Sequence, residues 1–259
     1  MFKFCNLYSG SSGNSSFIKT TNTKILVDCG TSVKKINEAL ESIDESLENI
    51  DGILITHEHS DHIKGLATLC KKYDIPIYAN KKTLAEIQKN IDVKNYKIFK
   101  TNENFEINDL KIHSFAIPHD AADPVGFTIS TKTKKISIAT DIGHMENKIL
   151  KNLDGSNFVL LESNYEPDML KSSRYPYLLK KRIMGPDGHL SNEDASLTVK
   201  ALVSGGLKNV MLGHLSQENN FPELAYQTTI NELITSNIDT KKLSVTIADR
   251  SHPNKLINI

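Results

Sequence analysis

The stretch Ile53-Leu-Ile-Thr-His57-Glu-His59-Ser-Asp61-His62-Ile-Lys-Gly65 places three histidines and one aspartate within six positions, directly after a short apolar run. Imidazole and carboxylate are side chains that divalent metals such as Zn²⁺ and Mn²⁺ accept as ligands. Four of them together would be costly inside a core without partners, and a solvated surface gives no reason for their clustering. We therefore interpret the stretch as part of a metal site at the end of a strand. A polar loop that happens to be rich in histidine is the alternative.

The composition is that of an ordinary soluble globular protein, with 259 residues, 39% of them apolar and 24% charged. Positive and negative side chains balance at 31 each, so a nucleic-acid partner would have to meet a local basic patch. Cys5, Cys29 and Cys70 are odd in number and widely spaced, which predicts free thiols in a reducing compartment. The N-terminus lacks a signal-peptide pattern and no apolar run could span a membrane, so we expect a cytoplasmic protein with no membrane partner. The oligomeric state stays open.

The periodicity of the apolar residues predicts a layered α/β protein. Three short strands near 2–8, 16–20 and 25–28 predict an antiparallel start to a sheet, and further strands are expected at 53–55, 75–79, 96–99, 110–117, 125–130, 135–139, 157–161, 208–212 and 243–248. Helices are expected at 32–43, 63–73, 82–90, 191–204 and 222–234. Two β-rich blocks that are each followed by helices favour a single domain over 1–259. The segment 165–190 interrupts this rhythm and is interpreted as an insert that faces the substrate.

Three more apolar runs end in a residue type that binds metals. His119 follows 115–118, Asp141 follows 136–140, and His214 follows 210–213. Alone, a histidine after a strand is more often structural, but together with the first stretch these residues make seven candidate ligands: His57, His59, Asp61, His62, His119, Asp141 and His214. Seven ligands exceed what one tetrahedral zinc can use, so we expect two metal ions that share a bridging carboxylate. Zn²⁺, Mn²⁺ and Fe²⁺ all suit such a set, which leaves the identity of the metal open.

The same series of residues resembles the motifs of the metallo-β-lactamase superfamily. The resemblance implies an αββα sandwich of two mixed sheets flanked by helices, with a dinuclear metal site along one edge. It also implies a division of the ligands, in which one metal is held by His57, His59 and His119, the other by Asp61, His62 and His214, and Asp141 bridges both. The β-lactamases of the best-known class carry Cys at the bridging position, which argues against antibiotic hydrolysis for this chain.

Four segments resemble the narrower YycJ/WalJ-like subfamily: 9–15, 175–183, 188–192 and 213–216. That resemblance implies a phosphodiesterase with exonuclease activity on duplex DNA. The chain has no room for the large β-CASP insert of RNase J-type nucleases. We therefore expect a metal-dependent hydrolase of phosphodiester bonds in nucleic acid, with DNA as the expected substrate. A hydrolase of thiolesters or lactones, similar to glyoxalase II, is the first alternative, and a metal-bound sensor without catalysis is the second.

The expected reaction uses a hydroxide that bridges the two metals and attacks phosphorus in line. Asp61 is expected to orient this hydroxide as well as to bind metal, so no protein nucleophile is needed. The leaving alkoxide requires a general acid, and His189 is the candidate because a histidine can donate a proton near pH 7. A structural role at the start of a helix is its alternative. His144 lies close to Asp141 in the sequence and is expected to support a metal ligand from behind.

Residues expected to contact the substrate fall in several places. The small-residue turn offers Ser12 and Asn14 as donors, although simple hairpin chemistry explains the turn equally well. The repeated His-Leu-Ser places Ser191 and Ser216 before two predicted helices, whose N-termini would attract phosphate; ordinary N-capping is the alternative. Asn164 follows a strand and is expected near the site. The basic residues of the insert are expected to bind phosphates beside tyrosines that stack on a base, unless they form a solvated helical face: Arg174, Lys180, Lys181 and Arg182.

Overall fold

The computed structural model describes residues 1–259, which divide into two compact units. Unit 1 comprises residues 1–116, 121–133 and 249–259, and unit 2 comprises residues 117–120 and 134–248. Each unit has its own strands, helices and buried core. The expectation of one domain over 1–259 therefore stays a prediction.

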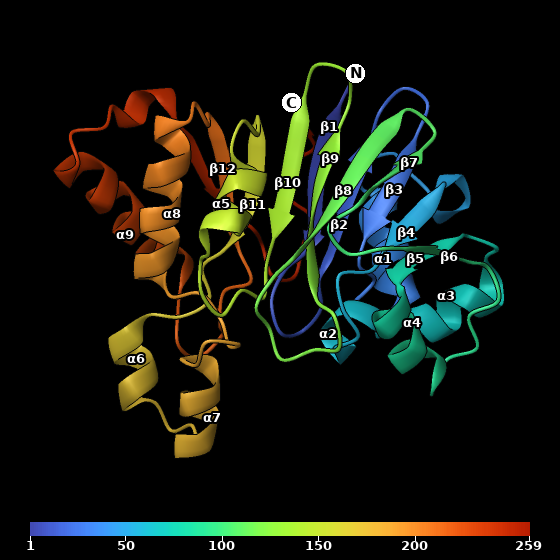
Figure 1. Cartoon of the computed structure of the whole chain (residues 1–259), viewed down its shortest axis with the longest axis horizontal. Coiled ribbons are helices and arrows are strands. Elements are labelled where there is room, and N and C mark those ends of the chain that lie inside the picture. The colour runs from blue at the N-terminus through green and yellow to red at the C-terminus, as the bar shows by residue number, and fades with distance from the viewer. The chain divides into compact units, whose positions relative to one another are not determined.

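Unit 1 is built on a mixed sheet of seven strands in the order β14-β1-β2-β3-β4-β5-β6 (Figure 1). The pairs from β14 to β3 are antiparallel and those from β3 to β6 are parallel, which confirms the predicted antiparallel start. The strands are β1 (Lys3–Tyr8), β2 (Ser15–Lys19), β3 (Lys24–Val27), β4 (Gly52–Leu54), β5 (Ile77–Asn80), β6 (Tyr96–Phe99) and β14 (Ile257–Asn258). Unit 1 also contains an antiparallel meander of β7 (Asn104–Ile107), β8 (Leu110–Ala116) and β9 (Val125–Ser130).

The helices of unit 1 bury their apolar faces against its sheet. Val33, Ile36 and Leu40 lie on the buried face of α1, and the side chain of Ser32 accepts a hydrogen bond from Lys35, as expected for an N-cap. A core of Leu, Ile, Val and Phe side chains joins these helices to β1–β5. The helices are α1 (Val33–Glu41), the 3₁₀ helix η1 (Leu47–Asn49), α2 (Ser60–Ile63), α3 (Leu66–Lys72) and α4 (Lys81–Gln88).

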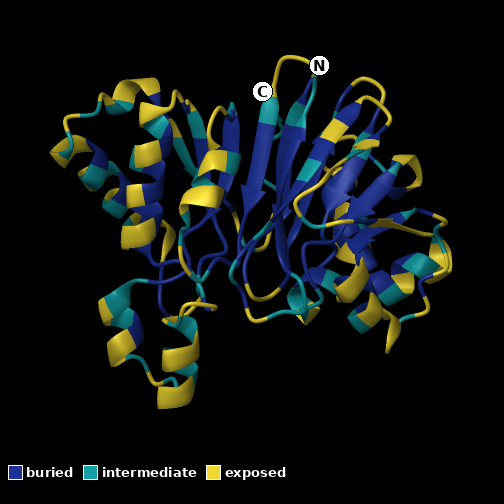
Figure 2. Cartoon of the chain, viewed as in Figure 1, coloured by how far each residue is buried: buried dark blue, intermediate teal, exposed yellow.

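Unit 2 contains four consecutive parallel strands, β10 to β13. They are β10 (Lys135–Ala139), β11 (Phe158–Glu162), β12 (Asn209–Gly213) and β13 (Ser244–Ile247). Strand β11 is buried throughout, which explains its continuous apolar sequence (Figure 2). Helix α8 packs against α9 beside these strands. The covering helices are α5 (Asn147–Leu153), α8 (Asn192–Ser204), α9 (Pro222–Thr235) and η2 (Thr240–Lys242).

The insert expected at 165–190 folds as two short helices, α6 (Pro167–Ser172) and α7 (Tyr177–Ile183). In Figure 1 this helical pair projects from unit 2, away from its strands and from α8 and α9. Helix α6 buries only Leu170, and α7 buries no residue at all. The pair is therefore held by its ends and by polar contacts, not by a core of its own.

All three cysteines are free, as the sequence predicts. Cys5 and Cys29 are buried, and burial raises the pKa of the Cys5 thiol to about 12 and that of Cys29 well above its ordinary value. None of the helices combines the length and the apolar character that crossing a membrane requires.

Candidate metal site

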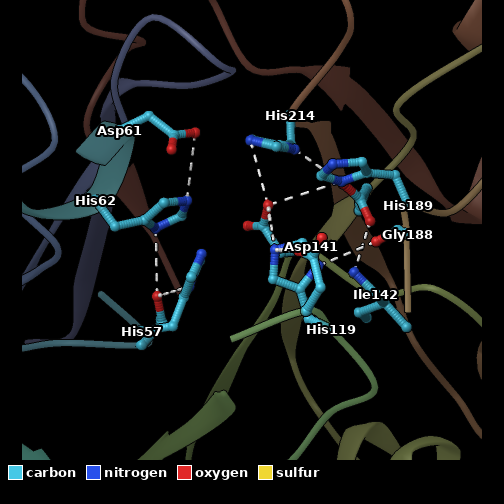
Figure 3. Close-up of polar contacts among 12 residues, drawn as sticks. His57, Asp61, His62, His119, Asp141, Ile142, Gly188, His189 and His214 are labelled. Atoms are coloured by element: carbon cyan, nitrogen blue, oxygen red, sulfur yellow. Dashed lines mark hydrogen bonds and ion pairs between the residues drawn. The ribbon is translucent and has the colours of Figure 1, made fainter. Parts of the chain in front are cut away.

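In unit 1, the predicted ligands lie where β4 ends. His57 is the third residue after the strand and is fully buried, and His59 is the residue that precedes α2. Asp61 and His62 lie within that short helix, with Asp61 partly exposed and His62 fully buried. The ring of His57 lies 4.7 Å from that of His59 and 4.1 Å from that of His62. The opening stretch therefore folds as a strand end and one helical turn that gather four metal-binding side chains. Figure 3 shows three of them, His57, Asp61 and His62.

A buried carboxylate at the end of β3 supports two of these histidines. Oδ2 of Asp28 lies 2.8 Å from Nδ1 of His62, and the hydroxyl of Thr56 donates a hydrogen bond of 2.9 Å to the same carboxylate oxygen. The Thr56 oxygen in turn lies 3.0 Å from Nδ1 of His57, and the Thr56 amide donates to Oδ1 of Asp28. Asp28 was not predicted from the sequence, although it follows an apolar strand in the same way as the predicted ligands.

The small-residue turn contacts α2 through backbone and side chain. The amide of Asn14 donates to the carbonyl of Asp61, and its side-chain Nδ2 lies 3.0 Å from Nε2 of His62 and 3.3 Å from Oδ2 of Asp61. Gly30 packs so closely that a Cβ there would lie 1.6 Å from the Asp61 carbonyl oxygen. The structure thus places Asn14 beside two predicted ligands, whereas Ser12 is exposed on the outside of the turn.

In unit 2, the carboxyl ends of neighbouring parallel strands bring together the other candidates. Asp141 follows β10, Glu162 ends β11, and His214 follows β12. Oδ1 of Asp141 lies 3.5 Å from Nε2 of His214 and 3.9 Å from Nε2 of His119. Figure 3 shows His119, His189 and His214 arranged around Asp141. Strand register makes this possible, because parallel partners end together at one edge of a sheet.

Glu162 contacts two histidines of this cluster in unit 2, and it was not predicted from the sequence. Its Oε1 lies 2.8 Å from Nδ1 of His214 and 2.9 Å from Nδ1 of His189, while Oε2 accepts hydrogen bonds from the amides of Ile142 and Leu190. Burial alone would raise the pKa of this carboxyl, but the charges and hydrogen bonds of His189 and His214 outweigh burial and lower the pKa to about 2. Glu162 is therefore an ionised carboxylate that orients two imidazoles.

The loop that carries His119 is tied to the end of the insert. Nδ1 of His119 lies 3.1 Å from the carbonyl oxygen of Gly188, and the amide of Asp120 donates to the carbonyl of Asp187. Arg182, in α7, makes two contacts with the Asp120 carboxylate, Nε to Oδ2 at 2.5 Å and Nη2 to Oδ1 at 3.1 Å. This guanidinium, predicted to bind phosphate, is thus engaged with a carboxylate.

Three of the strand-end residues adopt left-handed backbone: Asp28, Asp141 and His214, with φ of 61°, 60° and 55°. Aspartate and histidine adopt this region more often than most residues, but it is uncommon for any residue other than glycine. Such strained positions cluster at functional sites, where surrounding contacts hold them in place. For His214, these contacts include a hydrogen bond of 2.7 Å from Nδ2 of Asn164 to the His214 carbonyl, which gives Asn164 a positioning role.

The donor set fits divalent metals. A histidine whose Nδ1–H is donated to an oxygen carries its lone pair on Nε2, and this is how ligand histidines are commonly oriented. Within unit 2, Asp141, Glu162, His189 and His214 offer ligand atoms that all lie within 4.8 Å of one another. In four of the predicted ligand histidines an oxygen atom of another residue faces Nδ1. Thr56 provides it for His57, Asp28 for His62, Gly188 for His119 and Glu162 for His214. Clusters of histidine and aspartate with this orientation suit divalent cations.

Several predicted roles need correction. His144 is exposed and contacts the Pro186 carbonyl and Glu146, so it does not stand behind a metal ligand. Ser191 does cap α8, where its hydroxyl lies 2.7 Å from Asp194, but Ser216 does not precede a helix. Helix α9 begins only at Pro222. The residues between Ser216 and Pro222 form a turn, in which the Asn219 amide donates to the Ser216 hydroxyl and the Phe221 amide donates to the Asn220 side chain.

The remaining predicted substrate residues lie on the insert. Arg174 and Lys181 are exposed, and Lys180 is partly buried, with Nζ donating to the Lys171 carbonyl at 2.6 Å. Their role in binding substrate stays a prediction.

Comparison with known proteins places the chain in a family. The family described as "Beta-lactamase superfamily domain" matches residues 23–215. The chain is 38% identical to exodeoxyribonuclease YycJ of Bacillus anthracis, over 86% of this chain and 85% of the relative, and 38% identical to exodeoxyribonuclease WalJ of Streptococcus pneumoniae, over 90% and 88%. The chain belongs to the β-lactamase superfamily, in the YycJ/WalJ group. The resemblance inferred from the sequence motifs is thereby confirmed.

A solved structure shares the fold. The Zn²⁺-bound PqqB of Methylobacterium extorquens is similar with a TM-score of 0.72 and 16% identity, over 98% of this chain and 99% of that one. The expected fold class, two mixed sheets flanked by helices, is confirmed. At this identity the likeness concerns the fold alone. This YycJ/WalJ-group chain is a hydrolase by its superfamily.

Proposed function

We propose that this chain is a metal-dependent exodeoxyribonuclease. The observation that carries the proposal is the set of buried carboxylates, Asp28 and Glu162, that hold candidate ligand histidines through Nδ1. Such support is typical of metal centres, and the YycJ and WalJ relatives, named exodeoxyribonucleases, supply the class of substrate. Removal of nucleotides from the ends of DNA is the activity that combines the two.

We propose that two divalent ions, Zn²⁺ or Mn²⁺ with Fe²⁺ as a third option, are held by the seven ligands expected from the sequence. One ion would be held by His57, His59 and His119 and the other by Asp61, His62 and His214, with Asp141 bridging. When bound, such a pair would activate water and neutralise charge on the phosphate. The support for this assignment is the family motif and the orientation of the imidazoles.

Within this proposal, the protein's own residues position and move protons. His189 donates a proton to the leaving oxygen of the cleaved phosphodiester, with its ring held by the Glu162 carboxylate at 2.9 Å. Its side chain is partly exposed, at 17%, so a substrate atom can reach it. Asn14 lies 3.3 Å from Oδ2 of Asp61 and limits the orientations of that carboxylate.

The test is an incubation of metal-free protein, reloaded with Mn²⁺ or Zn²⁺, with end-labelled linear duplex DNA, closed circular DNA, single-stranded RNA and S-lactoylglutathione. We expect mononucleotides from the linear duplex and no cleavage of the circle. Asp61→Ala should abolish release, whereas Asp168→Ala, which removes an exposed carboxylate, should not. Cleavage of the thiolester with intact DNA would replace the proposal with the glyoxalase II-like alternative. A folded, metal-loaded protein that cleaves none of the four would favour a sensor.

A further inference from the structure

Helix α7 exposes apolar side chains to an unusual degree. It buries none of its seven residues (Figure 2). Tyr177 and Leu178 are 77% and 76% exposed. A single exposed apolar residue is ordinary, but two large neighbours on a projecting helix indicate a binding surface. The structure gives these two residues no packing role in unit 2.

The same segment is locally basic in a chain of zero net charge. Residues 165–184 contain five cations, Lys171, Arg174, Lys180, Lys181 and Arg182, against two acids, Glu166 and Asp168. Lys171 pairs with Asp168 at 3.2 Å, and Arg182 is engaged with Asp120. Arg174 and Lys181 are exposed and have no carboxylate partner, so they are available to an anionic ligand.

Aromatic ring and cation share one face of the helix. Tyr177 and Lys181 are four residues apart in α7, a spacing that places side chains on the same side of a helix. A planar ring beside an ammonium group matches one nucleotide, which offers a flat base and a phosphate, and base stacking on aromatic rings tolerates any sequence. An acidic peptide would use the cations but not the flat face of the ring.

We propose that the Tyr177–Lys181 face of α7 binds the terminal nucleotide of a DNA strand. The tyrosine ring stacks on the end base, Lys181 binds the adjacent phosphate, and Arg174 binds a second phosphate. This inference rests on the proposed exonuclease function, because a terminal base is the one that has a free face in a duplex. It gives the enzyme a means of selecting ends over continuous duplex.

The attachment of α7 links this surface to the candidate site. Beyond Lys181, Arg182 contacts the Asp120 carboxylate, and Gly188 accepts from Nδ1 of His119 at 3.1 Å. The end of a DNA strand that α7 binds is therefore held close in the sequence to residues that contact the His119 loop. His119 is a predicted metal ligand. Helix α7 and the His119 loop both belong to unit 2.

The test measures binding of the full-length, metal-loaded protein to a fluorescein-labelled linear duplex with phosphorothioate linkages, which resist cleavage, by fluorescence anisotropy. Tyr177→Ala should weaken binding about tenfold or more, whereas Tyr177→Phe, which keeps the ring, should bind as the wild type does. Replacing both Arg174 and Lys181 by Ala should reduce the slope of log K against log salt by about 2. Tyr226→Ala on α9 and Lys241→Ala, matched exposed residues of unit 2, should change neither quantity.

Equal affinity of Tyr177→Ala and wild type would overturn the inference, as would equal binding of linear and closed circular duplex. Sedimentation with anionic phosphatidylserine vesicles that depends on Tyr177, while DNA binding does not, would identify a membrane surface and also overturn it. The outcome is separable from that of the proposed function. If Tyr177→Ala cleaves linear DNA with the KM of the wild type, the proposed nuclease function stands and the proposed binding surface is rejected. If the protein binds DNA ends through Tyr177 but cleaves no substrate, only the proposed nuclease function is rejected.

Discussion

Oε1 of Glu162 lies 2.8 Å from Nδ1 of His214, at the carboxyl end of two paired parallel strands of unit 2. Unit 1 repeats the arrangement, with Oδ2 of Asp28 at 2.8 Å from Nδ1 of His62. In both units a buried carboxylate at a strand end contacts the Nδ1 atom of an imidazole and thereby orients the ring. The position of each imidazole is thus set by rigid strands, which suits a site that must keep its geometry through many turnovers.

Glu162→Gln should weaken metal binding by about 10- to 100-fold, because the amide removes the negative charge that increases the basicity of His214 and orients it. Competition against a chromophoric chelator measures this change. Asp168→Asn, an exposed acid of the same unit, is the control and should bind metal as the wild type does. Unchanged affinity in Glu162→Gln would show that its carboxylate supports the fold but not the metal.

His189→Gln should lower kcat on DNA by about 10²–10⁴-fold with metal content unchanged, because it removes the proposed proton donor. The loss should nearly disappear with bis(p-nitrophenyl) phosphate, whose leaving group needs no proton. Steady-state kinetics on both substrates, with metal analysis of each sample, decides the matter. Equal losses on the two substrates would assign His189 to metal binding or to positioning.

Gly30→Ala should destabilise the protein by about 3 kcal/mol, because the new Cβ would lie 1.6 Å from the backbone oxygen of Asp61 and neither backbone segment can yield cheaply. Gly155→Ala is a matched comparison. That glycine has φ of 71° but nothing within 4 Å, so only the left-handed strain of about 1 kcal/mol applies. Urea denaturation ranks the two, and Gly30→Ala alone should also weaken metal binding through Asp61.

Glu45→Gln should cost roughly 1–3 kcal/mol at neutral pH, since Glu45 is buried and binds Lys19 and Lys24. Burial would raise the pKa of Glu45, but the hydrogen bonds and charges of the two lysines outweigh burial and lower the pKa from its ordinary value. A lowered folded-state pKa means that the stabilisation is complete above about pH 4.5 and fades as the pH falls through the folded value. The difference between wild type and variant should therefore shrink in acid. Glu48→Gln, an exposed neighbour, should show no such dependence.

Arg182→Ala distinguishes two roles for this residue. If the contact with Asp120 positions the His119 loop, kcat falls several-fold while KM and the free energy of unfolding change little, since exposed ion pairs contribute about 0–1 kcal/mol. If Arg182 binds phosphate, as the sequence suggested, KM rises instead. In the first case Asp120→Asn should also lower kcat with little change in KM. Arg182→Lys should recover little of the lost kcat, because an ammonium group cannot form the two-armed contact with the carboxylate. If the losses of kcat are additive in the double variant of Arg182→Ala and Asp120→Asn, the two residues are not coupled.

Apolar strands that end in a ligand-type residue predicted much of the candidate site. That pattern located His57, Asp141 and His214, and the same rule applied to Asp28 and Glu162 would have found both supporting carboxylates. They were missed because a single acid after a strand is common, and only its burial and two imidazole partners make Glu162 exceptional. Burial depends on the neighbouring strands, which sequence spacing does not reveal.

Two of the elements that escaped prediction have little apolar periodicity. Helix α7 buries nothing and β7 buries only Ile107, so neither leaves a hydrophobic pattern in the sequence. The second His-Leu-Ser misled for a different reason. Serine caps turns as well as helices, and Ser216 serves a turn stabilised by Asn219.

The left-handed backbone at Asp141 restricts what laboratory evolution could install there. Converting the proposed bridging aspartate to the cysteine of the β-lactamases would place a residue with poor tolerance of φ near 60° at a strained position, at a cost of about 1–2 kcal/mol before any change in metal preference. Libraries aimed at a new metal should therefore leave positions 28, 141 and 214 intact. Diversity is better directed to positions of ordinary backbone, where a new side chain does not also have to overcome conformational strain.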